Sequence, residues 1–148
     1  MPPHETLTKF GYPDTLIAEY SHWAVLLRPQ QATIGSLVVA SVADIRRFSE
    51  VPREGFAELA EVIQQCESAL SSMFAYDKIN YLMLMMVDLQ VHMHVIPRYA
   101  EVRDFAGVRC LDEGWPGPPI LGASIELPAD GQLSLLSSLK DSWQGAGR

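Results

Sequence analysis

The alternation of apolar and polar positions predicts several short strands followed by one long helix. Apolar, β-branched and aromatic residues fill the segments 15–20, 22–28 and 36–42, which we expect to be strands. Between 52 and 74, apolar residues recur every three or four positions, which predicts a helix with one apolar stripe. That stripe consists of Phe56, Leu59, Ile63, Cys66, Leu70 and Met73.

The second half of the chain predicts two further strands and a C-terminal helix. The strands span 78–87 and 89–96, and the unbroken run Met83–Met86 is typical of a central strand covered on both faces. Prolines and glycines indicate irregular structure from 99 to 128. The final helix is expected from about 131 to 143. Its inner stripe is expected to be Leu133, Leu136 and Leu139.

Together these elements predict an α+β domain with a mainly antiparallel sheet. A chain of 148 residues has the usual size of one domain, so we expect a single domain over 1–148. Its core is expected in about 15–100, with an irregular tail and a helix in 101–148. Two cysteines do not make a disulfide framework, and Cys66 is expected in the core because it lies in the helical stripe.

Charge and hydropathy exclude some classes of partner. The chain has 18 acidic and 11 basic residues, a formal charge of −7 and a pI of about 4.9. A protein that coats DNA or RNA needs a basic stripe, so we expect none of that binding. The N-terminus lacks the pattern of a signal peptide, and no apolar run is long enough to cross a bilayer. We therefore expect a cytoplasmic protein with no membrane partner.

The segment 89–98, Leu-Gln-Val-His-Met-His-Val-Ile-Pro-Arg, holds the candidate chemistry. Because alternate side chains of a strand share a face, Gln90, His92 and His94 should line up on one side. One interpretation is an ordinary strand whose polar face meets solvent. The other is a half-buried face that needs a ligand, because each unpaired buried polar group costs about 1–3 kcal/mol.

Imidazole chemistry favours an active site on that face. One histidine can act as a neutral nucleophile while its neighbour donates a proton. A histidine that attacks phosphorus forms a labile phosphorus–nitrogen bond and divides one difficult displacement into two easier ones. Gln90 can orient a phosphate or an adjacent ring. Pro97 is expected to end the strand, so that Arg98 lies just past its edge and offers a planar guanidinium to phosphate oxygens.

The run from Gln90 through His92 and His94 to Arg98 resembles the His-x-His-x-His signature of the histidine triad (HIT) superfamily. The resemblance covers about residues 15–100. Gln-x-His-x-His followed by Trp115-Pro-Gly-Pro118 is similar to one bacterial branch of HIT-like proteins. The resemblance implies a five-stranded, mainly antiparallel sheet with one long helix and a C-terminal helix, and a homodimer.

By this resemblance the protein is a nucleotide hydrolase or nucleotidyl transferase that acts on the α-phosphate of a nucleoside phosphate derivative. Phosphoramidases and dinucleoside polyphosphate hydrolases are the types it implies, with no cofactor and no metal in the covalent step. His92 would be the nucleophile, His94 would bind the phosphate or the leaving group, and Gln90 would occupy the first triad position. The implied substrate-binding residues are Arg98 and Ser36, with Ile17, Leu26 and Val38 around the base.

Four departures from the family pattern support a second hypothesis. Gln90 stands where a histidine is usual, and Ser36 replaces a further histidine. The segment before the triad lacks the Gly-x-x-Ala-Gly-Gln loop of many family hydrolases, and residues 24–27 offer no polar group to a ribose. The second hypothesis is therefore a catalytically weak or inactive module that binds a nucleotide or a protein.

A third hypothesis is a metal site built on the two histidines of the motif. Histidines two residues apart on a strand can reach one ion, but zinc needs three or four protein ligands. Asp88, Cys110 or His22 would have to complete the set.

Overall fold

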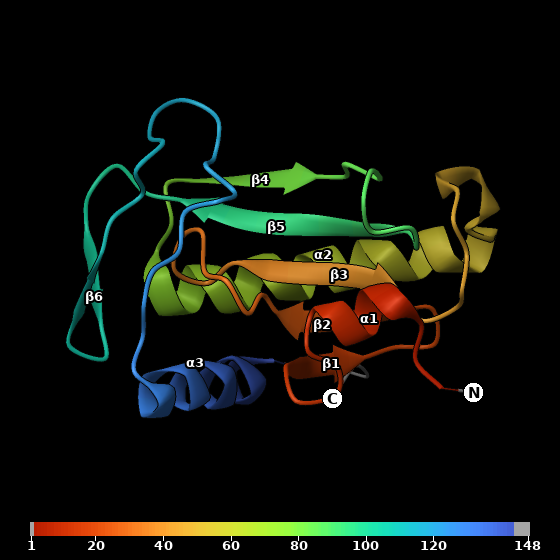
Figure 1. Cartoon of the computed structure of the whole chain (residues 1–148), viewed down its shortest axis with the longest axis horizontal. Coiled ribbons are helices and arrows are strands. Elements are labelled where there is room, and N and C mark those ends of the chain that lie inside the picture. The colour runs from red at the N-terminus through yellow and green to blue at the C-terminus, as the bar shows by residue number, and fades with distance from the viewer. Residues whose placement is uncertain (1, 144–148) are drawn as a thin grey trace.

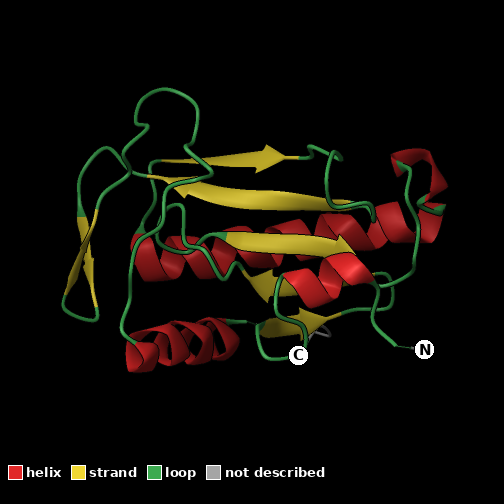
Figure 2. Cartoon of the chain, viewed as in Figure 1, coloured by secondary structure: helices red, strands yellow, loops and turns green. Residues whose placement is uncertain are grey.

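A computed structural model describes residues 2–143, and its centre is a five-stranded antiparallel sheet (Figures 1 and 2). The strands are β1 (Leu16–Glu19), β2 (Trp23–Leu27), β3 (Leu37–Ser41), β4 (Lys78–Leu82) and β5 (His92–Arg98). They are arranged in the order β1-β2-β3-β5-β4. The helices are α1 (Glu5–Lys9), α2 (Arg53–Phe74) and α3 (Ala129–Ser142), with a 3-10 turn η1 (Phe48–Glu50) before α2. The predicted α+β class and antiparallel sheet are confirmed.

Helix α2 covers one face of the sheet, behind the strands in Figure 1. Pro52 is its N-cap, where the missing N–H of proline costs little. The helix buries Gly55, Leu59, Val62, Cys66, Ala69, Leu70 and Phe74. The predicted stripe is therefore right at Leu59, Cys66 and Leu70, whereas Phe56 is exposed and packs on Phe48 of η1. Burial raises the pKa of the Cys66 thiol, as expected for a core cysteine.

Helix α3 packs against α2 and β1. Its buried residues are Gly131, Leu135 and Leu139, spaced four apart along the face that meets those elements. The predicted inner position of Leu133 is wrong, because that side chain is 67% exposed on the opposite face. A short hairpin of β6 (Arg103–Phe105) and β7 (Val108–Cys110) interrupts the tail that the sequence predicted to be irregular. No helix among residues 2–143 has the length and apolar character needed to cross a membrane.

The opposite face of the sheet carries α1, in front of the strands in Figure 1. Leu7 and Phe10 form a second apolar cluster with residues of β2 and β3 such as Val38. His4 is the N-cap of α1, and its ring nitrogens bond to Leu7 N and to the Ser41 carbonyl. The sequence gives little sign of α1, because five residues show only one helical repeat, from Leu7 to Phe10.

The chain between β4 and β5 corrects the predicted strands. Strand β4 ends at Leu82 and β5 begins at His92, so 83–91 is a loop instead of the end of one strand and the start of the next. Met85 has a φ of 53°, which breaks an extended strand, and Met86 is 79% exposed. An apolar run alone does not distinguish a buried strand from a loop with exposed apolar residues.

Pro97 does not end β5, although the sequence predicted that it would. The strand runs to Arg98, with Pro97 opposite Ile79 of β4. The pairing of β3 with β5 stops at Leu37 and Val95, and the Pro97 carbonyl instead accepts a hydrogen bond from Thr33 Oγ1. On that side Pro97 has no strand partner, so its missing N–H removes no ladder bond.

Candidate active site

His92 and His94 lie side by side on the face of the sheet that α1 covers. They are paired with Ala40 and Val38 of the neighbouring strand β3, respectively. Both are buried, and their rings stand nearly perpendicular with centroids 5.4 Å apart. The strand alternation used in the sequence analysis therefore places the two imidazoles together.

A backbone carbonyl fixes the tautomer of His92. Its Nδ1 lies 2.7 Å from the carbonyl oxygen of Gln90. Because a carbonyl can only accept a hydrogen bond, Nδ1 must carry a hydrogen. In the neutral ring, Nε2 then holds the free lone pair. His92 thus has the protonation pattern that a nucleophile at Nε2 requires.

Arg28 fixes the opposite tautomer in His94. The guanidinium Nε of Arg28 donates to His94 Nδ1 over 3.3 Å. A guanidinium does not accept hydrogen bonds, so Nδ1 is the acceptor and Nε2 carries the hydrogen of the neutral ring. Burial, with Arg28 and His92 as further causes, lowers the pKa of His94 to about 4. At neutral pH His94 is therefore an uncharged donor at Nε2.

Arg28 is held in place by three hydrogen bonds. Besides His94, it donates from Nη1 to the Gln30 carbonyl over 2.7 Å and from Nη2 to the Leu121 carbonyl over 3.3 Å. It is buried at the end of β2, and burial lowers its pKa. The sequence analysis placed Arg28 only as the last residue of the predicted strand 22–28. The available signal was a single arginine directly after five wholly apolar residues, 23–27.

The side chain of Gln90 points toward α1 and the loop after β3. Its Oε1 accepts hydrogen bonds from the Oγ1 and N of Thr6, at 2.6 and 3.3 Å. Its Nε2 donates to Asp44 Oδ1 over 2.9 Å, and this bond is the main reason why the pKa of Asp44 is lowered. Gln90 therefore anchors the segment that enters β5, and it holds His92 through its carbonyl alone.

A cavity of about 230 Å³ opens onto both histidines. Its other lining residues are Lys9 of α1 and the loop residues Leu84, Met85, Met86, Val87 and Asp88. Lys9 and Asp88 form an ion pair across it, with 2.5 Å between Nζ and Oδ1. The cavity is thus lined by two imidazoles, one ion pair and the apolar side chains of a loop.

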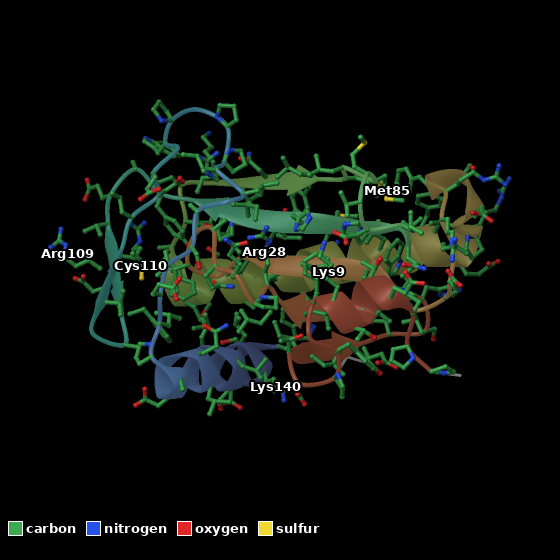
Figure 3. All side chains as sticks on the ribbon, in the orientation of Figure 1. Lys9, Arg28, Met85, Arg109, Cys110 and Lys140 are labelled. Carbon is green, nitrogen blue, oxygen red and sulfur yellow. The ribbon has the colours of Figure 1, made fainter. Side chains whose placement is uncertain are left out.

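A second cavity of about 190 Å³ adjoins the first through Lys9. Its remaining lining residues are Phe10, Arg28, Pro29 and Gln30. Figure 3 shows Lys9 and Arg28 near each other at the middle of the sheet. The Phe10 ring lies 5.9 Å from the ring of His92 and 5.6 Å from that of His94. The first cavity therefore opens onto the histidines, and Phe10, which lines the second cavity, lies beside both rings.

The sequence matches the family model of the HIT domain over residues 11–101, which is more than half of the chain. The chain belongs to the histidine triad family. Proteins of this family generally bind nucleotides. The curated proteins contain no match to this chain.

Solved structures of histidine triad proteins have the same fold. One from Bradyrhizobium japonicum is 19% identical, with a TM-score of 0.74 over 97% of this chain and 100% of that one. One from Marinobacter aquaeolei is 23% identical, with a TM-score of 0.73 over 95% of this chain and 93% of that one. A hypothetical histidine triad nucleotide-binding protein from Sulfolobus tokodaii is 18% identical, with a TM-score of 0.64 over 86% and 82%. At these identities the likeness shows the fold alone.

In this histidine triad protein, Arg98 does not join the histidines as the sequence had predicted. Its Nε and Nη2 donate to the two oxygens of Asp112, over 2.7 and 3.1 Å, and its Nη1 donates to Asn80 Oδ1 over 2.8 Å. Asp112 neutralises its charge, and both side chains are almost fully buried. Arg28, which is far from the motif in the sequence and follows β2, is the arginine that contacts His94.

The other predicted substrate-binding residues are divided between the two faces of the sheet. Leu26 and Val38 share the face of the histidines but are fully buried in the cluster with α1. Ile17 belongs to the core on the α2 side, because β1 has an irregular register between Leu16 and Ala18. Ser36 closes the turn that precedes β3, where its Oγ donates to the Thr33 carbonyl. The predicted base pocket is therefore not assembled from these residues.

The residues that a metal site would need do not gather around the histidine pair. Asp88 lines the cavity but is paired with Lys9, Cys110 lies in β7, and the backbone of His22 bonds to Glu58 of α2. Within the described part of the chain, no three His, Cys, Asp or Glu side chains are close enough to hold an ion.

Proposed function

We propose that this histidine triad protein is a hydrolase or nucleotidyl transferase that forms a transient nucleotidyl bond on His92. Its substrate is a nucleoside phosphate derivative with a leaving group on the α-phosphate. The observation that carries the proposal is the pair of opposite tautomers in the cavity: a lone pair on His92 Nε2 and a hydrogen on His94 Nε2. A nucleophile and a donor for the phosphate are thus prepared before substrate binds.

In the first step, the lone pair of His92 Nε2 attacks the α-phosphorus and forms a phosphorus–nitrogen bond. The bond between phosphorus and the leaving group breaks, and its electron pair departs with the leaving group, which takes a proton from water. The His92 ring becomes positively charged, because Nδ1 keeps its hydrogen. The Gln90 carbonyl, 2.7 Å away, stabilises that charge through the bond it already accepts.

In the second step, water attacks phosphorus and loses a proton to solvent. The phosphorus–nitrogen bond breaks, its electron pair returns to His92 Nε2, and a nucleoside monophosphate is released. A different acceptor in place of water makes the same step a transfer. The reaction therefore consists of two displacements at one phosphorus. His92 Nε2 is the nucleophile in the first and the leaving group in the second.

His94 acts as a hydrogen-bond donor to the phosphate in both steps. Its Nε2–H faces the negative oxygens, while the positive Arg28 lies behind its Nδ1. Donors that are oriented in advance stabilise the extra charge of the transition state without reorganisation. Because Nε2–H is the only hydrogen on the neutral ring's nitrogens, His94 donates a hydrogen bond and is not the source of the leaving group's proton.

The glutamine at the first triad position is compatible with catalysis. His92 depends on the backbone carbonyl of Gln90, and every residue has one. The side chain at this position instead bonds to Thr6 and Asp44. The exchange of histidine for glutamine therefore leaves the bond that orients the nucleophile in place.

The competing hypothesis is a binding module without turnover, which the missing phosphate loop favours. Turnover of a panel of phosphoramidates, dinucleoside polyphosphates and nucleotide sugars by wild type and His92→Ala distinguishes the two. The proposal expects turnover that disappears in the variant. Equal nucleotide binding by both proteins with no turnover by either supports the module. The cytoplasmic location and the homodimer remain predictions.

A further inference from the structure

The loop between β4 and β5 exposes several large apolar side chains in succession. Leu84 is 50% exposed, Met86 79% and Val87 82%. Figure 3 shows Met85 of this loop past the end of β4, and its side chain is partly buried against the core. Contiguous exposed apolar side chains in a folded protein mark a site that binds something apolar. They follow the end of β4, and unlike Met85 they do not pack into the core cluster.

The same loop forms a wall of the cavity that holds the histidines. Leu84, Met85, Met86 and Val87 all line it, together with His92 and His94. A group attached to a phosphorus at His92 Nε2 therefore has this loop within reach. Methionine side chains are flexible and polarisable, and they adapt to apolar groups of different shape.

The cavity offers little unpaired positive charge to a highly anionic leaving group. Among its described lining residues, Lys9 and Asp88 are the charged side chains, and they are paired with each other. Arg28 lines the neighbouring cavity and is occupied by His94 and two carbonyls. A polyphosphate leaving group would meet one paired cation and one carboxylate, whereas an apolar group meets four apolar side chains.

We propose that the loop 84–87 binds the leaving group, and that the preferred substrates carry an uncharged apolar amine or alcohol on the α-phosphate. This proposal rests on the proposed function and adds the class of substrate. For an amine, the phosphorus–nitrogen bond breaks, the amine nitrogen keeps the electron pair and takes a proton from water, and the free amine leaves. Each methylene group removed from water contributes about a fourfold preference.

The experiment compares three substrates of one nucleoside: the unsubstituted 5′-phosphoramidate, its N-hexyl derivative and a dinucleoside tetraphosphate. We expect kcat/KM for the N-hexyl compound to exceed that for the unsubstituted one by about tenfold or more, with the tetraphosphate lowest. Met86→Ser removes an exposed side chain of the loop and should reduce the N-hexyl preference about fivefold. Leu133→Ser, at another exposed apolar position, on α3, should leave the preference unchanged.

Binding to His92→Ala separates this proposal from the proposed function. The variant lacks the nucleophile but keeps the loop, so calorimetry should still give a lower Kd for the N-hexyl compound. Turnover without a preference for the N-hexyl compound, or a preference for the tetraphosphate, overturns the leaving-group proposal alone. A preference that survives in Met86→Ser, with a changed oligomeric state, assigns the loop to protein contact instead. Absence of turnover with preferential binding overturns only the proposed function.

Discussion

Arg28 donates from Nε to Nδ1 of His94, and this one hydrogen bond joins the end of β2 to the middle of β5. The two strands are separated by β3, so the guanidinium reaches across the face of the sheet. The bond keeps a permanent cation behind a neutral imidazole and turns the ring's only N–H toward the cavity. Much of the proposed chemistry depends on that arrangement.

Removing Arg28 should change both the titration and the activity. In Arg28→Ala the positive charge is lost, so the pKa of His94 rises toward its ordinary value, and Nδ1 loses the donor that fixes its tautomer. We expect kcat to fall at least about tenfold, as for other losses of oriented donors. Titration of the histidine ring by NMR measures the pKa directly. Arg109→Ala removes an exposed arginine on β7 and serves as the control.

Arg28→Lys distinguishes charge from geometry. Lysine keeps a cation but lacks the planar fork that holds His94 and two carbonyls together. We expect it to restore part of the low pKa but little of the activity. Activity restored to the wild-type level would mean that charge alone is required.

The stability of the fold should decrease in mild acid because of His94. Its folded-state pKa of about 4 lies below the ordinary value of 6.5. Between these two pH values the unfolded chain binds a proton that the folded chain does not, so unfolding becomes easier as pH falls. One such group lowers the free energy of unfolding by up to about 1.4 kcal/mol per pH unit. Urea unfolding of wild type and His94→Asn between pH 4.5 and 7 should show a steeper dependence in wild type.

Gln90→Ala should affect stability more than it affects the nucleophile. The variant removes the acceptor of the buried Thr6 Oγ1, and with it the side-chain bond between α1 and the segment before β5. A buried polar group without a partner costs about 1–3 kcal/mol, which thermal unfolding will measure. Because the backbone carbonyl that holds His92 remains, kcat should fall far less than in His92→Ala. An equal loss in both variants contradicts the assignment of Gln90 as an anchor.

Arg98→Ala tests whether this arginine is structural. It leaves Asp112 buried and unpaired, and breaking a buried pair in this way costs about 3–5 kcal/mol. Arg98→Ala combined with Asp112→Ala should recover part of that loss. The folded fraction of the double variant should retain a wild-type KM. A raised KM in a fully folded double variant would mean that Arg98 binds substrate.

The sequence predicted those features whose pattern extends over enough residues. Strand alternation placed His92 and His94 on one face, and helical periodicity located α2 and its buried Cys66. Helix α1 and the hairpin of β6 and β7 were missed, because five and three residues hold too few repeats.

The composition of the site depended on contacts that no local pattern contains. Whether Arg28 or Arg98 meets the histidines is decided by the order of β2, β3 and β5 in the sheet and by the position of Asp112. The apolar run Met83–Met86 is equally suited to a central strand and to a cavity wall. It lies in the loop that follows the edge strand β4, with Met85 at a positive φ, and there residues 84–86 line the cavity.

Trapping the covalent intermediate tests the central claim most directly. Wild type and His92→Ala are mixed with a nucleoside 5′-phosphoramidate, quenched within milliseconds at alkaline pH and measured as intact proteins, with the modified residue located by peptide sequencing. The account predicts one nucleotidyl adduct, on His92, that forms and decays during turnover and is absent from the variant. Turnover by wild type with no adduct, or with an adduct on His94, would contradict it.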